Sequence, residues 1–269
     1  MTARSITSPR NQRIKDTLRL RVAKHRAKQD CTLIDGAREV ARALDAGISL
    51  AEVFVCESLC HSADCHALVA RLGELSCPVW QVTPPVFERI AYGQRAEGVL
   101  AVAHVPQRSL SGLQLAPGAL VAVACGLEKP GNLGALLRSA DAAGLAAVIV
   151  ADGGTDLYNP NCIRASLGTI FTQPVCPATS AATLTWLRER GAKVFAARVD
   201  AATDYTDADY SGETAIVLGS EAAGLPAAWR DPLVTPVKLP MRGSADSLNV
   251  SAAAAVLFYE ALRQRTVSP

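Results

Sequence analysis

Short apolar segments alternate with amphipathic ones along the first hundred residues. Four apolar runs are too short for buried helices and are bounded by turn residues, so they predict strands, at 32–34, 51–56, 79–82 and 98–105. Apolar residues recur at helical spacing in 37–44 and 67–72, and both patterns end near a glycine, which predicts two helices. A third helix is expected from Ser8 to about Lys28. These elements predict a small α/β domain.

The second half of the chain repeats a strand, loop and helix order. Apolar runs predict strands at 120–125, 147–151, 193–197, 215–218 and 234–239, and helices are expected from Asn132, near 182–190 and over 248–265. This order is typical of a parallel sheet with both faces covered, which binds ligands at the carboxyl ends of its strands. We therefore expect an α/β domain over 119–269, joined by a linker at 107–118 to a domain over 1–106.

Positive charge is concentrated at the N-terminus. Residues 1–28 contain nine Lys or Arg residues and one Asp, a net charge of +8, which leaves −6 for the remainder because the whole chain carries +2. Such a segment is typical of a protein that binds a polyanion, although a solvated helix face would have the same composition. Aromatic residues make up 5%, which leaves few rings for base stacking. We expect a polyanion to contact this segment, including Arg19, Arg21, Lys24 and Arg26.

The chain contains no strongly apolar stretch of membrane-spanning length and no secretory signal, so a cytoplasmic protein without membrane contact is expected. Its eight cysteines include no CxxC pair and are expected to be reduced. Cys56, Cys60 and Cys65 lie near His61 and His66, but their spacing fits no standard zinc pattern. No metal is therefore expected.

Polar loops follow three of the predicted strands. In the first loop, Pro130 and Gly131 form a turn, Asn132 is placed to cap a helix, and Arg138 lies about 1.7 turns further on, where a cation meets a phosphate at the helix N-terminus. An ordinary capped helix with a surface arginine is an equally good interpretation of this loop alone. The combination with the other two loops decides between them.

The second and third loops follow Leu218 and Leu239. Gly219 and Gly224 in the second loop permit close backbone approach or positive φ, as a ligand at the strand end requires, although a plain turn explains them too. In the third loop, Pro240 stiffens the exit from the strand and Ser247 is placed to cap the last helix. Each loop alone is a weak signal for a nucleotide site.

Together the three loops resemble the three sequence motifs of the SpoU (TrmH) family of the SPOUT superfamily. These are Asn132-Leu133-Gly134 with Arg138, Leu218-Gly219-Ser220-Glu221 with Gly224, and Pro240-Met241 leading to Ser247-Leu248-Asn249-Val250-Ser251. The segment from Arg164 to Gly168, followed by Phe171, is similar to a further family element. The resemblance covers about residues 119–265, and the N-terminal domain matches the family's RNA-binding extension more loosely. Cys125 stands where the family commonly has an aspartate.

The resemblance implies a parallel sheet with a C-terminal trefoil knot, which is otherwise very rare. It implies S-adenosylmethionine bound in that knot, with the cofactor contacts at Leu218, Gly219, Leu239, Met241 and Leu248. The catalytic position falls on Arg138, and supporting polar positions fall on Asn132, Glu221, Ser247 and Asn249. A homodimer is implied through the knotted domain, with the small-residue face of the last helix near the interface, at Ala253, Ala254, Leu257, Ala261 and Leu262.

The chemistry expected is methyl transfer to a ribose 2'-hydroxyl of RNA, most of all 23S ribosomal RNA. No histidine or carboxylate in the motifs stands out as the base, and arginine, with a pKa above about 12, is a poor proton acceptor. We expect Arg138 to bind the adjacent phosphate and orient the hydroxyl, with Glu221 steadying Arg138. The alternatives are a transfer RNA methyltransferase, an enzyme acting on a small nucleotide, and a non-catalytic RNA-binding protein. Binding of S-adenosylmethionine distinguishes an enzyme from a bare scaffold.

Overall fold

A computed structural model describes residues 4–93 and 97–267, and the chain folds into two compact units. The first unit contains Met1–Gln107 and Tyr158–Thr172, and the second contains Arg108–Leu157 and Gln173–Pro269. Residues 158–172 thus pack with the first unit, although the sequence places them inside the range expected for the second domain. No helix in the described part of the chain is long and apolar enough to cross a membrane.

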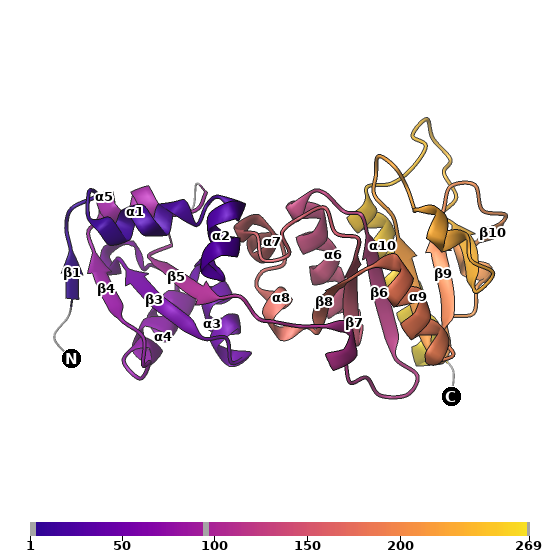
Figure 1. Cartoon of the computed structure of the whole chain (residues 1–269), viewed down its shortest axis with the longest axis horizontal. Helices are drawn as coiled ribbons and strands as arrows, with labels where there is room; N and C mark the ends of the chain where they lie inside the picture. The colour runs from indigo at the N-terminus through magenta and orange to yellow at the C-terminus, as the bar shows by residue number, and fades with distance from the viewer. Residues whose placement is uncertain (1–3, 94–96, 268–269) are drawn as a thin grey trace. The chain divides into compact units, whose positions relative to one another are not determined.

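The first unit is a five-stranded mixed sheet with helices around it (Figure 1). The strand order is β1-β4-β3-β5-β2, in which β5 is antiparallel to both neighbours and the other pairs are parallel. The strands are β1 (Arg4–Ile6), β2 (Cys31–Asp35), β3 (Leu50–Val55), β4 (Val79–Val82) and β5 (Val99–His104). The helices are α1 (Gln12–Arg19), α2 (Ala23–Gln29), α3 (Ala37–Asp45), α4 (Ala63–Leu72), α5 (Pro84–Ile90), α7 (Pro160–Ala165) and α8 (Thr169–Thr172).

The single basic helix predicted over 8–28 is wrong. The segment forms two short helices, because Val22 adopts an extended conformation between α1 and α2. Two of the four cations expected to contact a polyanion bond to the protein's own backbone. Arg26 is buried and donates to the Leu20 carbonyl at 2.7 Å, while Arg21 donates to the carbonyls of Arg89 and Ala91.

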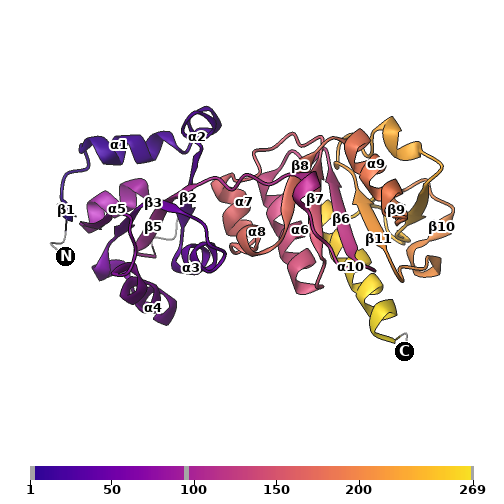
Figure 2. The same cartoon turned by 60° about the horizontal axis from the view of Figure 1, so that its bottom comes forward.

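The second unit is a parallel seven-stranded sheet in the order β10-β12-β9-β11-β6-β7-β8. The strands are β6 (Leu120–Cys125), β7 (Ala147–Ala151), β8 (Val175–Ala178), β9 (Lys193–Ala197), β10 (Thr203–Asp204), β11 (Thr214–Leu218) and β12 (Val234–Lys238). Helices α6 (Pro130–Ala142) and α10 (Val250–Val267) pack against each other on one face, and α9 (Ser180–Glu189) covers the other (Figure 2). The parallel α/β sheet expected from the sequence is confirmed.

Alternate residues of the central strands supply the cores on the two faces of this sheet. Val121 and Val123 of β6 pack in one buried cluster with Leu184 and Leu187 of α9. The expected linker adds Leu110, Leu113 and Leu115 to the same cluster, so this segment is partly buried. On the other face, α10 buries Ala254, Leu257 and Ala261 within its own chain. These three residues of the predicted face are therefore not available for a subunit contact, whereas Ala253 and Leu262 are partly exposed.

The expectation that all cysteines are reduced is wrong for one pair. Cys60 follows a 3₁₀ turn at Glu57–Leu59, and Cys65 lies in the first turns of α4, which brings their Cα atoms to 5.5 Å in a disulfide. This distance lies in the usual range for a disulfide. Among the described residues, no group of three or more His, Cys, Asp or Glu side chains is arranged to hold a metal ion.

Candidate active site

A cavity of about 570 Å³ opens at the carboxyl end of the second sheet. Its walls come from the segments that follow β9, β11 and β12, three strands that are neighbours in the sheet. Because all three strands run parallel, their carboxyl ends meet at the same edge. The topology therefore brings together loops that lie up to about forty residues apart in the sequence.

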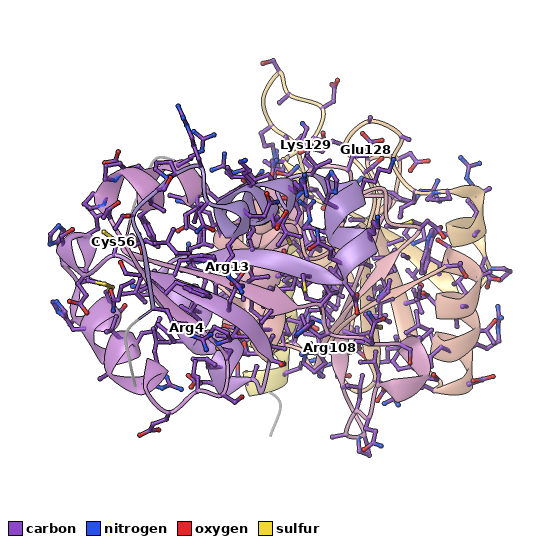
Figure 3. The ribbon with its side chains drawn as sticks, turned by 60° about the vertical axis from the view of Figure 1, so that its left-hand side comes forward. Arg4, Arg13, Cys56, Arg108, Glu128 and Lys129 are labelled. Atoms are coloured by element: carbon purple, nitrogen blue, oxygen red, sulfur yellow. A yellow bond between two sulfur atoms is a disulfide. The ribbon has the colours of Figure 1, made fainter. Side chains whose placement is uncertain are left out.

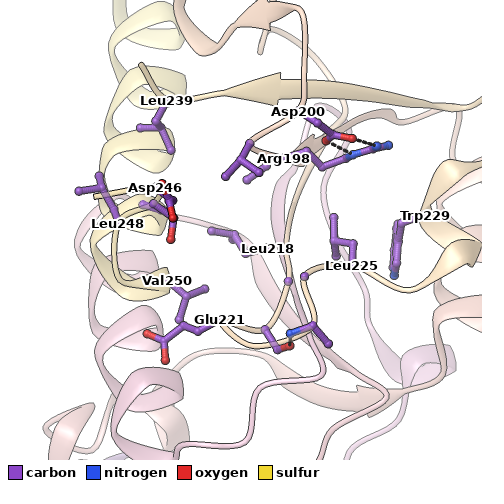
Figure 4. A pocket seen from close by; sticks show the side chains of 18 of the residues that line it. Arg198, Asp200, Leu218, Glu221, Leu225, Trp229, Leu239, Asp246, Leu248 and Val250 are labelled. Atoms are coloured by element: carbon purple, nitrogen blue, oxygen red, sulfur yellow. Dashed lines mark hydrogen bonds and ion pairs between the residues drawn. The ribbon is translucent and has the colours of Figure 1, made fainter. Parts of the chain in front are cut away.

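All five residues predicted to contact the cofactor line this cavity. They are Leu218, Gly219, Leu239, Met241 and Leu248. Figure 4 shows Leu239 and Leu248 on one side of the cavity and Leu225 and Trp229 on the other. The apolar walls suit a flat aromatic ring, and the nearby acids Glu221 and Asp246 suit a cationic group.

Two parts of the wall are absent from the sequence prediction. The segment after β9 supplies Arg198 and Asp200, whose side chains form two hydrogen bonds of 2.9 and 2.6 Å, and the hydrogen bonds from Arg198 lower the pKa of Asp200. Trp229 is buried and donates from Nε1 to Ser180 Oγ at 2.8 Å, and Ser180 in turn donates to Asp152. The strand ending at Ala197 was predicted, but no sequence signal placed it between the two motif strands.

Gly219 is required for a different reason than the predicted one. Its φ is not positive, and a Cβ atom there would lie 2.5 Å from the Gly224 carbonyl carbon and 2.9 Å from the Leu225 nitrogen. Ser220 and Gly224 exchange two backbone hydrogen bonds of 3.1 and 2.9 Å, which close the loop over Gly219. The glycine that has positive φ is Gly224, at +63°. Close packing of the loop on itself therefore explains Gly219 without a ligand.

A polar cluster joins the first and third motifs to Glu221. Glu221 Oε1 accepts from Asn249 Nδ2 at 2.7 Å and from Asn132 Nδ2 at 3.1 Å, and Oε2 accepts from Lys129 Nζ at 3.1 Å. A second cavity of about 200 Å³ lies at this cluster and shares Ser220, Glu221 and Val250 with the larger one. The structure thus brings three predicted polar residues together and adds Lys129.

Helix capping in the structure corrects two predicted roles. Helix α6 begins at Pro130, so Asn132 lies inside its first turn and its side chain bonds to Glu221 and Asn249 instead of capping. At the start of α10, Asn249 Oδ1 accepts from the Ser251 backbone at 3.0 Å, which is the contact expected of Ser247. Ser247 lines the larger cavity.

Charge in the cluster is set by Lys129 and not by Arg138. The hydrogen bond from Lys129 is the main cause that lowers the pKa of Glu221 below its ordinary value, so Glu221 is an anion and a weak base. The predicted contact from Glu221 to Arg138 is wrong. Arg138 is exposed on α6 and has no hydrogen bond or ion pair with any residue in the described part of the chain. Its guanidinium is therefore available to a phosphate.

Comparison with known proteins agrees with this geometry. The profile of the SpoU rRNA Methylase family matches residues 119–259, and that of the MRM3-like substrate binding domain matches residues 11–101. The 23S rRNA (guanosine(2553)-2'-O)-methyltransferase RlmP of Bacillus subtilis is 30% identical over 95% of this chain and 98% of its own length.

Solved structures give the same result. A crystal structure of an RNA 2'-O ribose methyltransferase is 43% identical, with a TM-score of 0.86 over 98% of this chain and all of the other. The SpoU methyltransferase AviRb from Streptomyces viridochromogenes, in complex with AdoMet, is 27% identical, with a TM-score of 0.83 over 97% of this chain and all of its own. The fold and the loops at its sheet edge define a methyltransferase with a parallel α/β sheet. The chain belongs to the SpoU rRNA methylase family.

Proposed function

We propose that this protein transfers a methyl group from S-adenosylmethionine to a ribose 2'-hydroxyl of 23S ribosomal RNA. The observation that carries the proposal is the pair of adjoining cavities, one lined by the predicted cofactor residues and the other by the polar cluster around Glu221. The shared wall of Ser220, Glu221 and Val250 allows a group in one cavity to meet a group in the other. Similarity to RlmP and to AdoMet-bound AviRb supports both the substrate and the cofactor.

The residues present fit the cofactor. A cavity of about 570 Å³ falls in the range of about 300 to 1,000 Å³ typical of sites for ligands of this size. Leu218, Leu239 and Leu248 offer apolar contact for an adenine ring, and Glu221 and Asp246 offer negative charge for a cationic ligand. When bound, S-adenosylmethionine supplies an electrophilic methyl group on a sulfonium.

The chain's own residues position the RNA for this reaction. Arg138 binds the phosphate next to the target ribose and holds the 2'-hydroxyl toward the shared wall, since its planar guanidinium can grip a phosphate through two hydrogen bonds. Asn132 and Asn249 hold the Glu221 carboxylate, and Lys129 keeps it ionised. A low pKa makes Glu221 unsuitable as the base, so its role in the proposal is electrostatic.

The proposal includes a trefoil knot and a homodimer. The chain after β12 crosses back over β9 and β11 to reach α10, which packs against α6. This path is the one that the chain would follow if it passed through the loop after β11 to form a knot. The exposed apolar residues of α10, Val256 and Tyr259, supply a surface for a second copy. The domain over 1–106 binds RNA, the domain over 119–269 performs the transfer, and a ribosomal RNA substrate places the reaction in the cytoplasm.

Mapping of 2'-O-methyl groups by mass spectrometry tests the function. Ribosomal and transfer RNA from a deletion strain is compared with RNA from the parent strain and from a strain complemented with Arg138→Ala. We expect one 23S site to lose its methyl group in the deletion strain and to stay unmethylated with the variant. Loss of a transfer RNA methyl group instead would identify the other substrate class, and no loss in either RNA would contradict the proposal.

A further inference from the structure

Trp80 lies on β4, next to the edge strand β1 of the first sheet, with two arginines over its ring. Arg13 of α1 has its guanidinium carbon 4.4 Å from the ring centroid, and that of Arg4 of β1 lies at 5.5 Å. Arg4 and Trp80 are register partners on the neighbouring strands β1 and β4. Figure 3 labels the side chains of Arg4 and Arg13 in the first unit. Guanidinium groups at this distance from an indole ring are attracted by its π electrons.

Glu52 fixes the position of this group. Its Oε2 accepts from Trp80 Nε1 at 3.0 Å and from Arg13 Nη1 at 3.1 Å, so one carboxylate oxygen orients both the ring and one guanidinium. The Glu52 side chain is 17% exposed, whereas that of Arg13 is 50% exposed. The orienting acid is therefore mostly covered while the cation that it holds faces solvent.

Most of the donors of the two arginines remain available. A guanidinium has five N–H donors at its edge, and Arg13 uses its Nη1 for Glu52. Arg4 is exposed, and its side chain makes no hydrogen bond within the described part of the chain. Two cations against one carboxylate leave a net positive charge. Stacking on the ring restricts the motion of both side chains, which reduces the entropy that a ligand must remove on binding.

We propose that Trp80, Arg13 and Arg4 form a phosphate clamp that holds the RNA backbone. The ligand is the phosphodiester group of the RNA backbone. The N–H groups at the edges of the two guanidiniums bind its oxygens, while the indole ring of Trp80 lies against or near the guanidinium faces. The clamp rests on the proposed function, because it is the RNA of that reaction that it binds. It also moves the expected contact from Arg21 and Arg26, which bond to backbone carbonyls, to Arg13 of α1 and Arg4 of β1.

Binding of a protein-free 23S rRNA transcript at several salt concentrations tests the clamp. Arg4→Gln and Arg13→Gln should each weaken binding about tenfold or more, as loss of a hydrogen bond to a charged group does. Each should also make the slope of log affinity against log salt less steep by about 0.7 to 0.9, the value for one lost phosphate contact. Trp80→Leu keeps both charges, so it should weaken binding with little change in slope.

Arg71→Gln is the matched control. Arg71 pairs with Asp45 at 2.6 Å, and its side chain is 47% exposed, close to the value for Arg13, but no aromatic ring among the described residues stacks on it. The Arg71→Gln variant should bind RNA with the affinity and the salt dependence of the wild-type protein. Arg13→Lys and Arg4→Lys preserve charge at the sheet edge and should bind with intermediate affinity, provided that circular dichroism shows the native fold.

Two outcomes separate the clamp from the function. If the double variant Arg4→Gln with Arg13→Gln binds RNA as tightly as Arg71→Gln does, the clamp is wrong even when methylation is normal. If wild-type protein neither binds nor methylates the transcript, the proposed function fails and the clamp with it. S-adenosylmethionine affinity should stay unchanged in all these variants, because none of the substituted residues lines the cofactor cavity.

Discussion

Arg138 is the residue whose role depends most on what the protein binds. It is exposed on α6 and lines neither of the two cavities. Because it has no hydrogen bond or ion pair among the described residues, its removal should change the free energy of unfolding by about 0.5 kcal/mol or less. Its substitution therefore reports on the substrate and not on stability.

Arg138→Ala should lower the rate of methyl transfer by about a hundredfold or more, the usual effect of removing one preorganised electrostatic contact. The affinity for S-adenosylmethionine, measured by calorimetry, should stay within about twofold of wild type, because Arg138 is absent from the cavity wall. Arg138→Lys keeps the charge but not the planar fork, so a severe loss is expected there too. Full activity of the lysine variant would show that Arg138 contributes only a positive charge.

Asp35 illustrates a buried carboxylate that ionises at a cost. Burial raises its pKa to about 7, even though the Tyr92 backbone amide at 2.6 Å and Arg164 at 3.5 Å favour the charged form. Oδ1 is buried and has no hydrogen-bond partner among the described residues. Because the folded-state pKa is above the unfolded one, the contribution to stability is complete at low pH and is lost as the pH rises through about 7.

Asp35→Asn should flatten the pH dependence of the first unit's stability. Between pH 5 and pH 8, ionisation of Asp35 should lower the free energy of unfolding of the wild-type unit by about 2 to 3 kcal/mol. The variant lacks this ionisation, so this part of the decrease should be absent. Hydrogen exchange measured by mass spectrometry reports this locally, through the protection factors of the β5 amides at both pH values. Equal pH dependence in the two proteins would show that Asp35 is ionised without penalty.

At the scale of elements, the loop after β11 combines ligand contact with tight self-packing. Gly219→Ala places a Cβ within 3 Å of the Gly224 backbone, so the Ser220–Gly224 turn must shift. Because this turn carries part of the cavity wall, cofactor affinity should fall about tenfold or more. Gly131→Ala is the control, since its Cβ meets nothing within 4 Å and alanine suits a helix. Equal cofactor affinity in both variants would show that the loop tolerates the shift.

Much of the arrangement of elements could be predicted from the sequence, and the reasons for the failures are physical. Strands β6, β7 and β11 are uniform apolar runs, so their composition alone identifies them. Strands β8 and β10 were not predicted, because β8 contains Pro177 and β10 is the polar pair Thr203–Asp204. The position of β9 between β11 and β12 depends on long-range pairing that leaves no local pattern, so the wall at Arg198 and Asp200 was missed. Val22 interrupts the basic segment through its backbone conformation, which a count of charges does not detect.

The cluster around Glu221 shows the same limit for side chains. The motifs select Asn132, Glu221 and Asn249 by their identities, and the structure brings these three side chains into one hydrogen-bonded cluster. Which donor reaches the carboxylate is decided by three-dimensional geometry, and there Lys129 takes the place expected for Arg138. Sequence motifs thus identify which residues meet at the site better than they identify which side chains bond to one another.

At the scale of the whole molecule, the surface of α10 predicts self-association. One face of this helix is buried in its own chain, but Tyr259 remains 51% exposed and Val256 36% exposed, three residues apart and so on one face. Sedimentation equilibrium at micromolar concentration should give twice the mass of one chain. Val256→Glu combined with Tyr259→Glu should give the mass of one chain, because buried carboxylates without partners oppose association.

Val22→Glu is the control. It substitutes an apolar residue of the first unit that is 55% exposed, similar to Tyr259, and should leave the dimer intact. A wild-type protein with the mass of a single chain would rule out the dimer, and dissociation of the Val22 variant alone would move the interface away from α10.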